Sequence, residues 1–144
     1  MRNAFPTHIE AMLAQLWQHA PESIPDWLPM HYVPWLPVVY EVAAGFTAAR
    51  PGRRNIYLVR LDFSDRGADL QGIYVGMTAL DPAQRFDQHR AGVRAAGSVL
   101  KRGLEILTGP VLHLQHIAQS DAVRIERDLA IALADAGLLV EGGH

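Results

Sequence analysis

Two short segments rich in β-branched and aromatic residues constrain the fold of this chain more than any other feature. Residues 55–63, NIYLVRLDF, and residues 72–78, GIYVGMT, alternate in the manner of strands, with a glycine-containing turn between them. Alternation with a period of two is typical of half-buried strands, so we expect an antiparallel hairpin. Within the second strand, Tyr74, Gly76 and Thr78 are expected to share one face.

Capping residues mark a helix directly after the hairpin. Thr78 or Asp81 can supply the side-chain cap, Pro82 fits the first turn, and Gly92 can end the helix. Polar caps and an early proline favour helix starts, and glycine favours helix ends. The sequence therefore predicts a helix over residues 82–91.

Two more helices and a third strand are predicted in the rest of the chain. Ser98 can cap a helix that extends to about Leu107, and residues 111–118, VLHLQHIA, alternate like a strand. A long helix is then predicted from Ser120 or Asp121. It is expected to end before Gly137, with a core stripe formed by Ala122, Ile125, Leu129, Leu133 and Ala136.

Composition divides the chain into two parts. Residues 1–52 contain a predicted helix that starts at Thr7, followed by a segment whose closely spaced prolines forbid long regular structure. We expect these residues to form a helical and Pro/Trp-rich extension, in which residues 38–49 fit a short helix or a strand. From residue 53 to 144 the element order indicates an α+β domain, with a small three-stranded antiparallel sheet flanked by helices.

Charge and composition limit the functional classes. The chain lacks cysteine, has no long apolar run and lacks a secretory signal pattern, so we expect no membrane partner and a cytoplasmic location. The formal net charge of −2 argues against coating nucleic acid by bulk charge. Residues 84–103 are locally basic, however, which fits either a solvated helical face or a phosphate-facing patch. The basic residues there are Arg85, Arg90, Arg94, Lys101 and Arg102.

Five residues with useful chemistry are brought together by the predicted elements. Tyr57 and Tyr74 lie on strands expected to pair, and Arg85 and His89 lie four residues apart on one helix and so share a face. Glu126 lies beside the apolar stripe of the last helix, where a carboxylate can be half-buried at a cleft.

This ordered set resembles the motifs of the GIY-YIG nuclease superfamily. Residues 55–57, Asn-Ile-Tyr, match the first motif, and residues 74–76, Tyr-Val-Gly, match the second. Arg85, His89 and Glu126 then match the arginine, histidine and glutamate that follow in the family.

The resemblance implies a divalent-metal-dependent endonuclease that hydrolyses DNA phosphodiester bonds. Its catalytic residues would be Tyr57, Tyr74, Arg85, His89 and Glu126. Glu126 would bind Mg²⁺ or Mn²⁺, and Arg85 would hold a phosphate oxygen. The proton of the attacking water would pass to Tyr57, Tyr74 or His89. Further nucleic-acid contacts are expected from Thr78, Arg90, Arg94, Lys101 and Arg102.

One departure from the family leaves a second function open. The family usually carries an asparagine in the stretch that corresponds to residues 138–141, and none is present here. Glu141 or His144 is the available substitute. The alternative is therefore a catalytically degenerate module of the same fold that binds nucleic acid or a protein partner. A partner protein or a homodimer would supply targeting to branched or damaged DNA.

Overall fold

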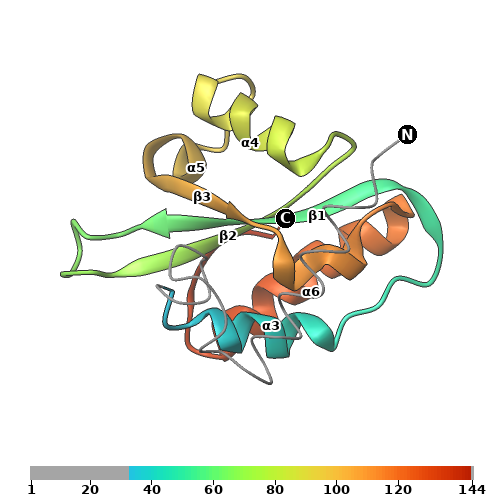
Figure 1. Cartoon of the computed structure of the whole chain (residues 1–144), viewed down its shortest axis with the longest axis horizontal. Coiled ribbons are helices and arrows are strands. Elements are labelled where there is room, and N and C mark those ends of the chain that lie inside the picture. Colours follow the sequence, from blue (N-terminus) through green and yellow to red (C-terminus); the bar gives the residue numbers. More distant parts are fainter. Residues whose placement is uncertain (1–32, 144) are drawn as a thin grey trace, which may run out of the picture.

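A four-stranded mixed sheet lies between two layers of helices (Figure 1). The structure is a computed structural model and describes residues 33–143. In chain order the elements are α3 (Leu36–Ala44), β1 (Pro51–Asp62), β2 (Gln71–Thr78), α4 (Pro82–Ala91), α5 (Gly97–Arg102), β3 (Gly103–Leu107), the 3₁₀ helix η2 (Gly109–Leu114), α6 (Gln119–Asp135) and β4 (Leu139–Gly142). The helix predicted from Thr7 lies outside the described residues.

The sheet has the strand order β3-β1-β2-β4. β1 pairs antiparallel with both β2 and β3, which confirms the predicted hairpin and the α+β class. β4 pairs with β2 in the parallel direction. The prediction of a three-stranded antiparallel sheet was therefore incomplete, because a short parallel strand forms the edge beside β2.

The third strand was predicted in the wrong place. Residues 111–118 begin in the 3₁₀ helix η2 and do not form the predicted strand. Their buried apolar residues are Val111, Leu114 and Ile117, which are three residues apart. The spacing of Val111 and Leu114 matches the three-residue turn of a 3₁₀ helix better than the two-residue period of a strand. Ile117 lies beyond η2 and forms isolated bridges with Pro51 and Arg54.

The actual third strand comes from the region predicted as the end of a helix. Helix α5 is short because the chain turns at Gly103, where an added Cβ would lie 2.6 Å from the carbonyl oxygen of Val99. β3 follows at once and pairs with β1. A close approach that only glycine permits thus divides the predicted helix from Ser98 to Leu107 into a helix and a strand.

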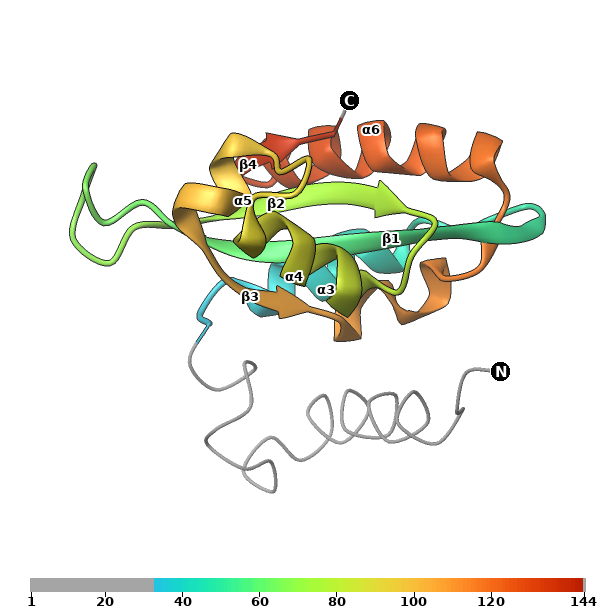
Figure 2. The same ribbon diagram turned by 90° about the horizontal axis from the view of Figure 1, so that it is seen from above.

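Two apolar clusters pack on opposite faces of the sheet. On one face, α3, η2 and α6 enclose the larger cluster, which includes Ile56, Leu58, Ile73 and Val75 from the strands. On the other face, α4 and α5 cover a smaller cluster built around Tyr57, Val59, Leu61, Phe63 and Val99. Figure 2 shows α4 and α5 in front of β1 and β2, with α3 behind them.

Helix α3 packs into the main core, although its residues fall within the predicted extension of residues 1–52. Its buried residues Leu36, Val39 and Ala43 belong to the same cluster as the strand residue Leu58. The segment for which helix and strand were both open is thus helical up to Ala44. No helix among residues 33–143 is long and apolar enough to cross a membrane.

The ends of α4 agree with the sequence signals. Asp81 caps the helix by accepting a hydrogen bond from the N–H of Ala83 at 2.9 Å, and Gly92 ends it in the left-handed conformation. Thr78, the other candidate cap, instead accepts a hydrogen bond from the N–H of Leu80 at 3.0 Å. The capping and termination of this helix are therefore local properties of the sequence.

Helix α6 is confirmed, but its start and its last core residue differ from the prediction. Neither Ser120 nor Asp121 caps it, because the N-cap position is Ala118. The carboxylate of Asp121 accepts hydrogen bonds from the N–H groups of Ala49 and Arg50 at 3.1 and 2.9 Å. These bonds lower the pKa of Asp121 and hold the entry to β1 against α6. Ala136 follows the helix and is exposed, so it does not belong to the core.

Candidate active site

The two tyrosines of the hairpin lie side by side on the sheet face that α4 covers. Tyr57 pairs with Gly76 and Tyr74 pairs with Val59, and paired residues on neighbouring strands share a face. The centroids of the two tyrosine rings are 5.9 Å apart. A Cβ on Gly76 would lie 2.5 Å from Cζ of Tyr57, so the ring rests directly on the backbone of β2. The glycine of the second motif is therefore needed to seat the first tyrosine.

His89 connects the hairpin to α4 and to the loop after it. Its Nε2 lies 2.8 Å from Oη of Tyr57, and its Nδ1 accepts a hydrogen bond from the N–H of Ala96 at 3.0 Å. Its ring centroid is 5.8 Å from that of Tyr74. Burial, and then the positive charge of Arg85, lower the pKa of His89 from 6.5 to about 4. His89 is therefore a neutral imidazole near pH 7.

Arg85 lies one turn before His89 and binds the same loop. Its Nη1 donates to the carbonyl oxygen of Val93 at 3.2 Å and to Oε1 of Gln88 at 3.1 Å. Its Nη2 donates to the carbonyl oxygen of Arg94 at 2.8 Å. The guanidinium thus holds the loop between α4 and α5, and its charge also acts on Tyr57.

Both tyrosine hydroxyls are protonated near neutral pH. Burial and the neighbouring Tyr74 raise the pKa of Tyr57 well above its usual range, and Arg85 opposes this shift in part. Burial also raises the pKa of Tyr74, and the negative charge of Glu126 adds to the shift. In the state described, neither tyrosine is preformed as a base.

Glu126 comes to this region from the helix on the opposite face of the sheet. It is only 6% exposed, although it lies on α6, and its charge acts on the hydroxyl of Tyr74. Residues 33–143 contain no group of three or more His, Cys, Asp or Glu side chains arranged to hold a metal ion. Mg²⁺ commonly binds through one or two carboxylates plus water and phosphate oxygens, so a single buried carboxylate fits that ion better than it fits Zn²⁺.

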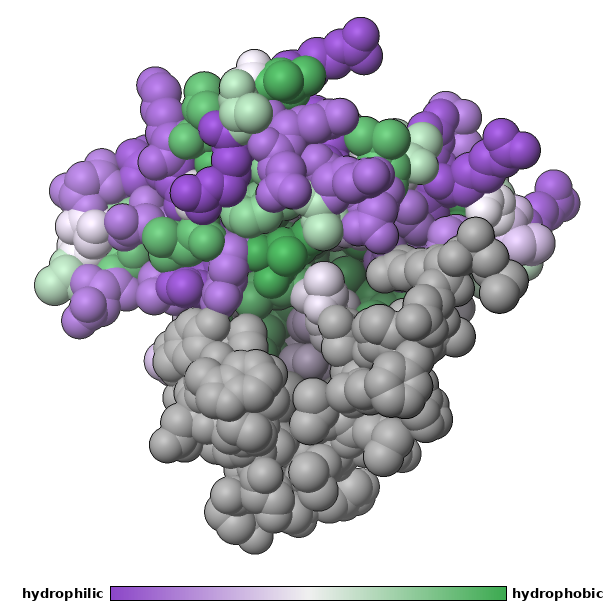
Figure 3. All heavy atoms as spheres, turned by 45° about the horizontal axis from the view of Figure 1, so that its top comes forward, coloured by the Kyte–Doolittle hydropathy of each residue, from purple (hydrophilic) through white to green (hydrophobic). Residues whose placement is uncertain are grey.

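The residues predicted to contact nucleic acid have different environments. Arg102 forms an ion pair with Asp65 and lies 4.4 Å above the ring of Phe63. Arg90 lies 5.6 Å from the ring centroid of Phe86. Thr78 is buried at the end of β2, whereas Arg94 and Lys101 are exposed. Figure 3 shows a largely hydrophilic surface with scattered apolar residues on the side where α4 and α5 lie.

Two hydrogen-bonding roles at the site were not predicted from the sequence. Asn55 is buried, donates to the carbonyl oxygen of Leu80 at 2.9 Å and accepts from the N–H of His116 at 2.9 Å. It thereby joins β1 to the segments before α4 and before α6. Ala96 contributes its backbone N–H, which donates to His89, and no pattern of side chains in the sequence could predict this bond. Asn55 could have been found as a polar residue within an apolar strand.

The proposed substitute Glu141 lies in β4, directly opposite Tyr74. Because cross-strand neighbours share a face, it is on the same side of the sheet as the two tyrosines. His144, the other possible substitute, lies outside the described residues. The unpredicted edge strand β4 therefore carries Glu141, one of the two residues that could replace the asparagine of the family.

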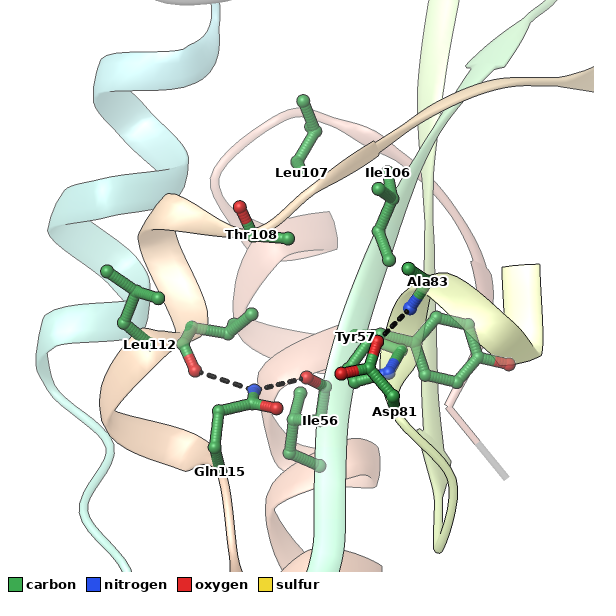
Figure 4. A pocket seen from close by; sticks show the side chains of 11 residues that line it. Ile56, Tyr57, Asp81, Ala83, Ile106, Leu107, Thr108, Leu112 and Gln115 are labelled. Carbon is green, nitrogen blue, oxygen red and sulfur yellow. Dashed lines mark hydrogen bonds between the residues drawn. The ribbon is translucent and has the colours of Figure 1, made fainter. Parts of the chain in front are cut away.

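A small cavity lies between β1, β3, η2 and the start of α4, and Tyr57 forms part of its wall (Figure 4). Its volume is about 170 Å³, and most of its lining is apolar. Gln115 donates from Nε2 to the carbonyl oxygens of Ile56 and Val111 at 2.7 and 2.9 Å, which fixes the orientation of its amide. Ligand pockets commonly measure about 300 Å³ or more, so this cavity does not suit a nucleotide.

Comparison with known proteins gives no match: no family model, no curated protein and no solved structure is significantly similar to this chain.

Proposed function

We propose that this chain is a divalent-metal-dependent nuclease of the GIY-YIG type that hydrolyses DNA phosphodiester bonds. The observation that carries the proposal is a convergence in space. Tyr57, Tyr74, Arg85 and His89 come from two strands and a helix and meet on one face of the sheet, where the charge of Glu126 also acts. An accidental resemblance in residue order gives no reason for the matched residues to meet.

Arg85 is the residue suited to bind a phosphate oxygen. Guanidinium groups bind phosphate through several N–H donors in a fixed plane. The hydrogen bonds to Val93, Arg94 and Gln88 use both hydrogens on Nη1 and one on Nη2. These bonds do not use the Nε–H and the second hydrogen on Nη2, which the hydroxyl of Tyr57 and a bound phosphate would share. Substrate binding is thus compatible with the loop as it lies.

Glu126 is the residue that would hold Mg²⁺ or Mn²⁺. When bound, such an ion stabilises negative charge on phosphoryl and leaving oxygens. Glu126 belongs to the 17-residue helix α6 and is 6% exposed. A ligand on a helix is placed more precisely than one on a loop, which suits a site with few protein donors.

Exposed cations beside the site are suited to track the DNA backbone. Arg94 and Lys101 are exposed near the loop that Arg85 and His89 hold, whereas Arg102 is paired with Asp65. Phosphate contacts of this kind position a duplex without reading its sequence. The described residues therefore support binding to DNA structure more than to a particular base sequence.

Cleavage of supercoiled plasmid and of a branched DNA, with Mg²⁺ or Mn²⁺, tests the proposal. The informative variant is Glu126→Gln, which keeps the shape and removes the charge. Glu41→Gln, an exposed change on α3, is the matched control. We expect the wild type and Glu41→Gln to cut, and Glu126→Gln to lose activity by about 100-fold or more. Equal cutting by all three proteins, or cutting that persists in a chelator, would contradict the proposal.

Burial favours the second candidate, a non-catalytic binding module. Tyr57 is 2% exposed and His89 is 1% exposed, and both have partners inside the protein. A module of this kind would bind branched DNA with a clear salt dependence and would leave it uncut with every metal tested. Binding measured by fluorescence anisotropy beside the cleavage assay separates the two functions.

A further inference from the structure

The backbone of the loop between α4 and α5 determines which nitrogen of His89 carries the proton. The N–H of Ala96 points at Nδ1 of His89 at 3.0 Å, and a backbone amide can only donate. Nδ1 must therefore accept. A neutral imidazole with an accepting Nδ1 carries its hydrogen on Nε2.

The direction of the next hydrogen bond follows from this tautomer. Nε2 of His89 lies 2.8 Å from Oη of Tyr57, so Nε2–H donates and the phenolic oxygen accepts. The hydroxyl hydrogen of Tyr57 must then point away from His89. Tyr74, on the same sheet face, and Arg85 are the other side chains that act on the hydroxyl of Tyr57, and of the two only the tyrosine has an oxygen that can accept its hydrogen. The polar contacts thus run in one direction, from Ala96 through His89 and Tyr57 towards Tyr74.

Access to solvent differs along this series. Tyr57 and His89 are almost fully buried, whereas Tyr74 is only partly buried. A water molecule that attacks a bound phosphate has to come from the solvent side. Of the three candidate groups, only Tyr74 is partly exposed. Because its hydroxyl is protonated, it can take the proton of the water only as it passes its own proton to solvent.

We propose that the N–H of Ala96 fixes His89 as a hydrogen-bond donor to Tyr57, so that His89 and Tyr57 act as positioning residues and Tyr74 is the residue that meets the attacking water. The catalytic part of this inference rests on the proposed nuclease function. The tautomer of His89 and the direction of its hydrogen bond do not depend on that function.

The loop conformation supports a fixed position for the Ala96 amide. Gly92 ends α4 in the left-handed conformation with φ 82°, and Arg94 also has a positive φ of 47°. The guanidinium of Arg85 holds the carbonyl groups of Val93 and Arg94. Arg85 and His89 thus bind the same short loop from neighbouring turns of α4, one through its carbonyls and the other through an N–H.

Nitrogen NMR of the full chain labelled with ¹⁵N-histidine tests the tautomer directly. His89 is assigned from the signal that disappears in His89→Gln. At pH 7 we expect a neutral ring with hydrogen on Nε2 and none on Nδ1. A hydrogen on Nδ1, or an imidazolium ring, would overturn the inference whether or not the protein cuts DNA. Failure of the tautomer and failure of the nuclease function are thus distinguished.

Two amide variants test the positioning role. The amide nitrogen of His89→Gln can take the place of Nε2 and still donate to Tyr57. The side-chain oxygen of His89→Asn takes the place of Nδ1 and can accept from Ala96, but the donor to Tyr57 is lost. If His89 serves as a donor, cleavage by His89→Gln should exceed cleavage by His89→Asn by about tenfold. Equal loss in both variants, at equal melting temperatures, would mean that His89 acts as a base and would refute the positioning role.

Discussion

The two faces of the sheet are built from the same strands but differ in their chemistry. The face under α3 and α6 encloses apolar residues such as Ile56 and Leu58, and they are fully buried. The face under α4 holds a smaller apolar cluster that includes Tyr57, with Tyr74 packed against it and the ring of His89 beside both tyrosines. One strand thus contributes Leu58 to a dry core and the adjacent Tyr57 to a polar site.

The two faces therefore contribute differently, one mainly to the stability of the fold and the other to the candidate site. A large apolar core supplies most of the free energy of folding, so the other face can hold polar groups that are costly to bury. The polar groups there are hydrogen-bonded to each other and to the loop after α4. Apart from Glu126, which α6 contributes to the candidate site, we expect substitutions of core residues on the α6 face to change stability and substitutions of polar residues on the α4 face to change function.

The largest expected effect is on stability, from a cavity on the α6 face. Ile125→Ala removes a fully buried side chain and should lower the free energy of unfolding by about 2–5 kcal/mol. Val123→Ala on the same helix is the matched control, because Val123 is 45% exposed. Urea denaturation measures both. Equal losses in the two variants would mean that this face does not form the main core.

The next effect is a pH dependence that originates on the α4 face. The pKa of His89 is lowered in the fold, so between pH 6.5 and about 4 the unfolded chain binds a proton that the folded chain does not. The free energy of unfolding should therefore fall as pH drops through this window, by at most about 3 kcal/mol. His89→Gln should lack this part of the dependence. Parallel stability curves for the two proteins over that window would contradict the neutral, buried state of His89.

A third substitution tests the contact between the two motifs. Gly76→Ala forces the ring of Tyr57 off β2, because the new Cβ would lie 2.5 Å from that ring. We expect a loss of about 1–3 kcal/mol in unfolding free energy and a loss of activity. In Gly97→Ala the new Cβ meets no atom within 4 Å, so this variant serves as a control of the same chemistry. Thermal denaturation and plasmid cleavage measure both, and similar behaviour of the two variants would show that the ring of Tyr57 is not seated on Gly76.

The smallest effect compares two surface arginines on the α4 side. Arg94→Gln should change stability by less than about 0.5 kcal/mol, yet reduce the slope of log affinity for DNA against log salt by about 0.9. Arg102→Gln breaks an ion pair with Asp65 and should cost up to about 1 kcal/mol of stability, with less change in the salt slope. Anisotropy titrations at several salt concentrations measure the slopes. Identical slopes for the two variants would argue against a DNA path beside the loop.

Local signals explain which elements the sequence predicts. The hairpin and α4 follow from alternation and from Asp81, Pro82 and Gly92, all of which act over a few residues. β4 was missed because it is four residues long and is stabilised by parallel pairing with β2, a non-local contact. The third strand was misplaced because short apolar runs fit more than one period, and the tight turn at Gly103 became visible only in three dimensions.

The proximity of the candidate residues could be predicted where it depends on the identity and spacing of side chains. Tyr57, Tyr74, Arg85 and His89 carry recognisable chemistry and regular spacing, and the structure brings them together. The N–H of Ala96 could not be predicted, because every residue except proline has this group. The hydrogen bonds from Arg85 to the carbonyl oxygens of Val93 and Arg94 could not be predicted either, because every residue has a backbone carbonyl.

One measurement tests most directly whether the α4 face performs chemistry: the rate of plasmid cleavage with Mg²⁺ by Tyr74→Phe and by Tyr40→Phe. Each variant removes a single hydroxyl, from Tyr74 on the α4 face and from Tyr40 on α3, which covers the opposite face. We predict a loss of about 100-fold or more for Tyr74→Phe, near wild-type activity for Tyr40→Phe, and little change in the melting temperature of Tyr74→Phe. Equal rates for the two variants and the wild type, or no cleavage by the wild type itself, would contradict a catalytic role for this face.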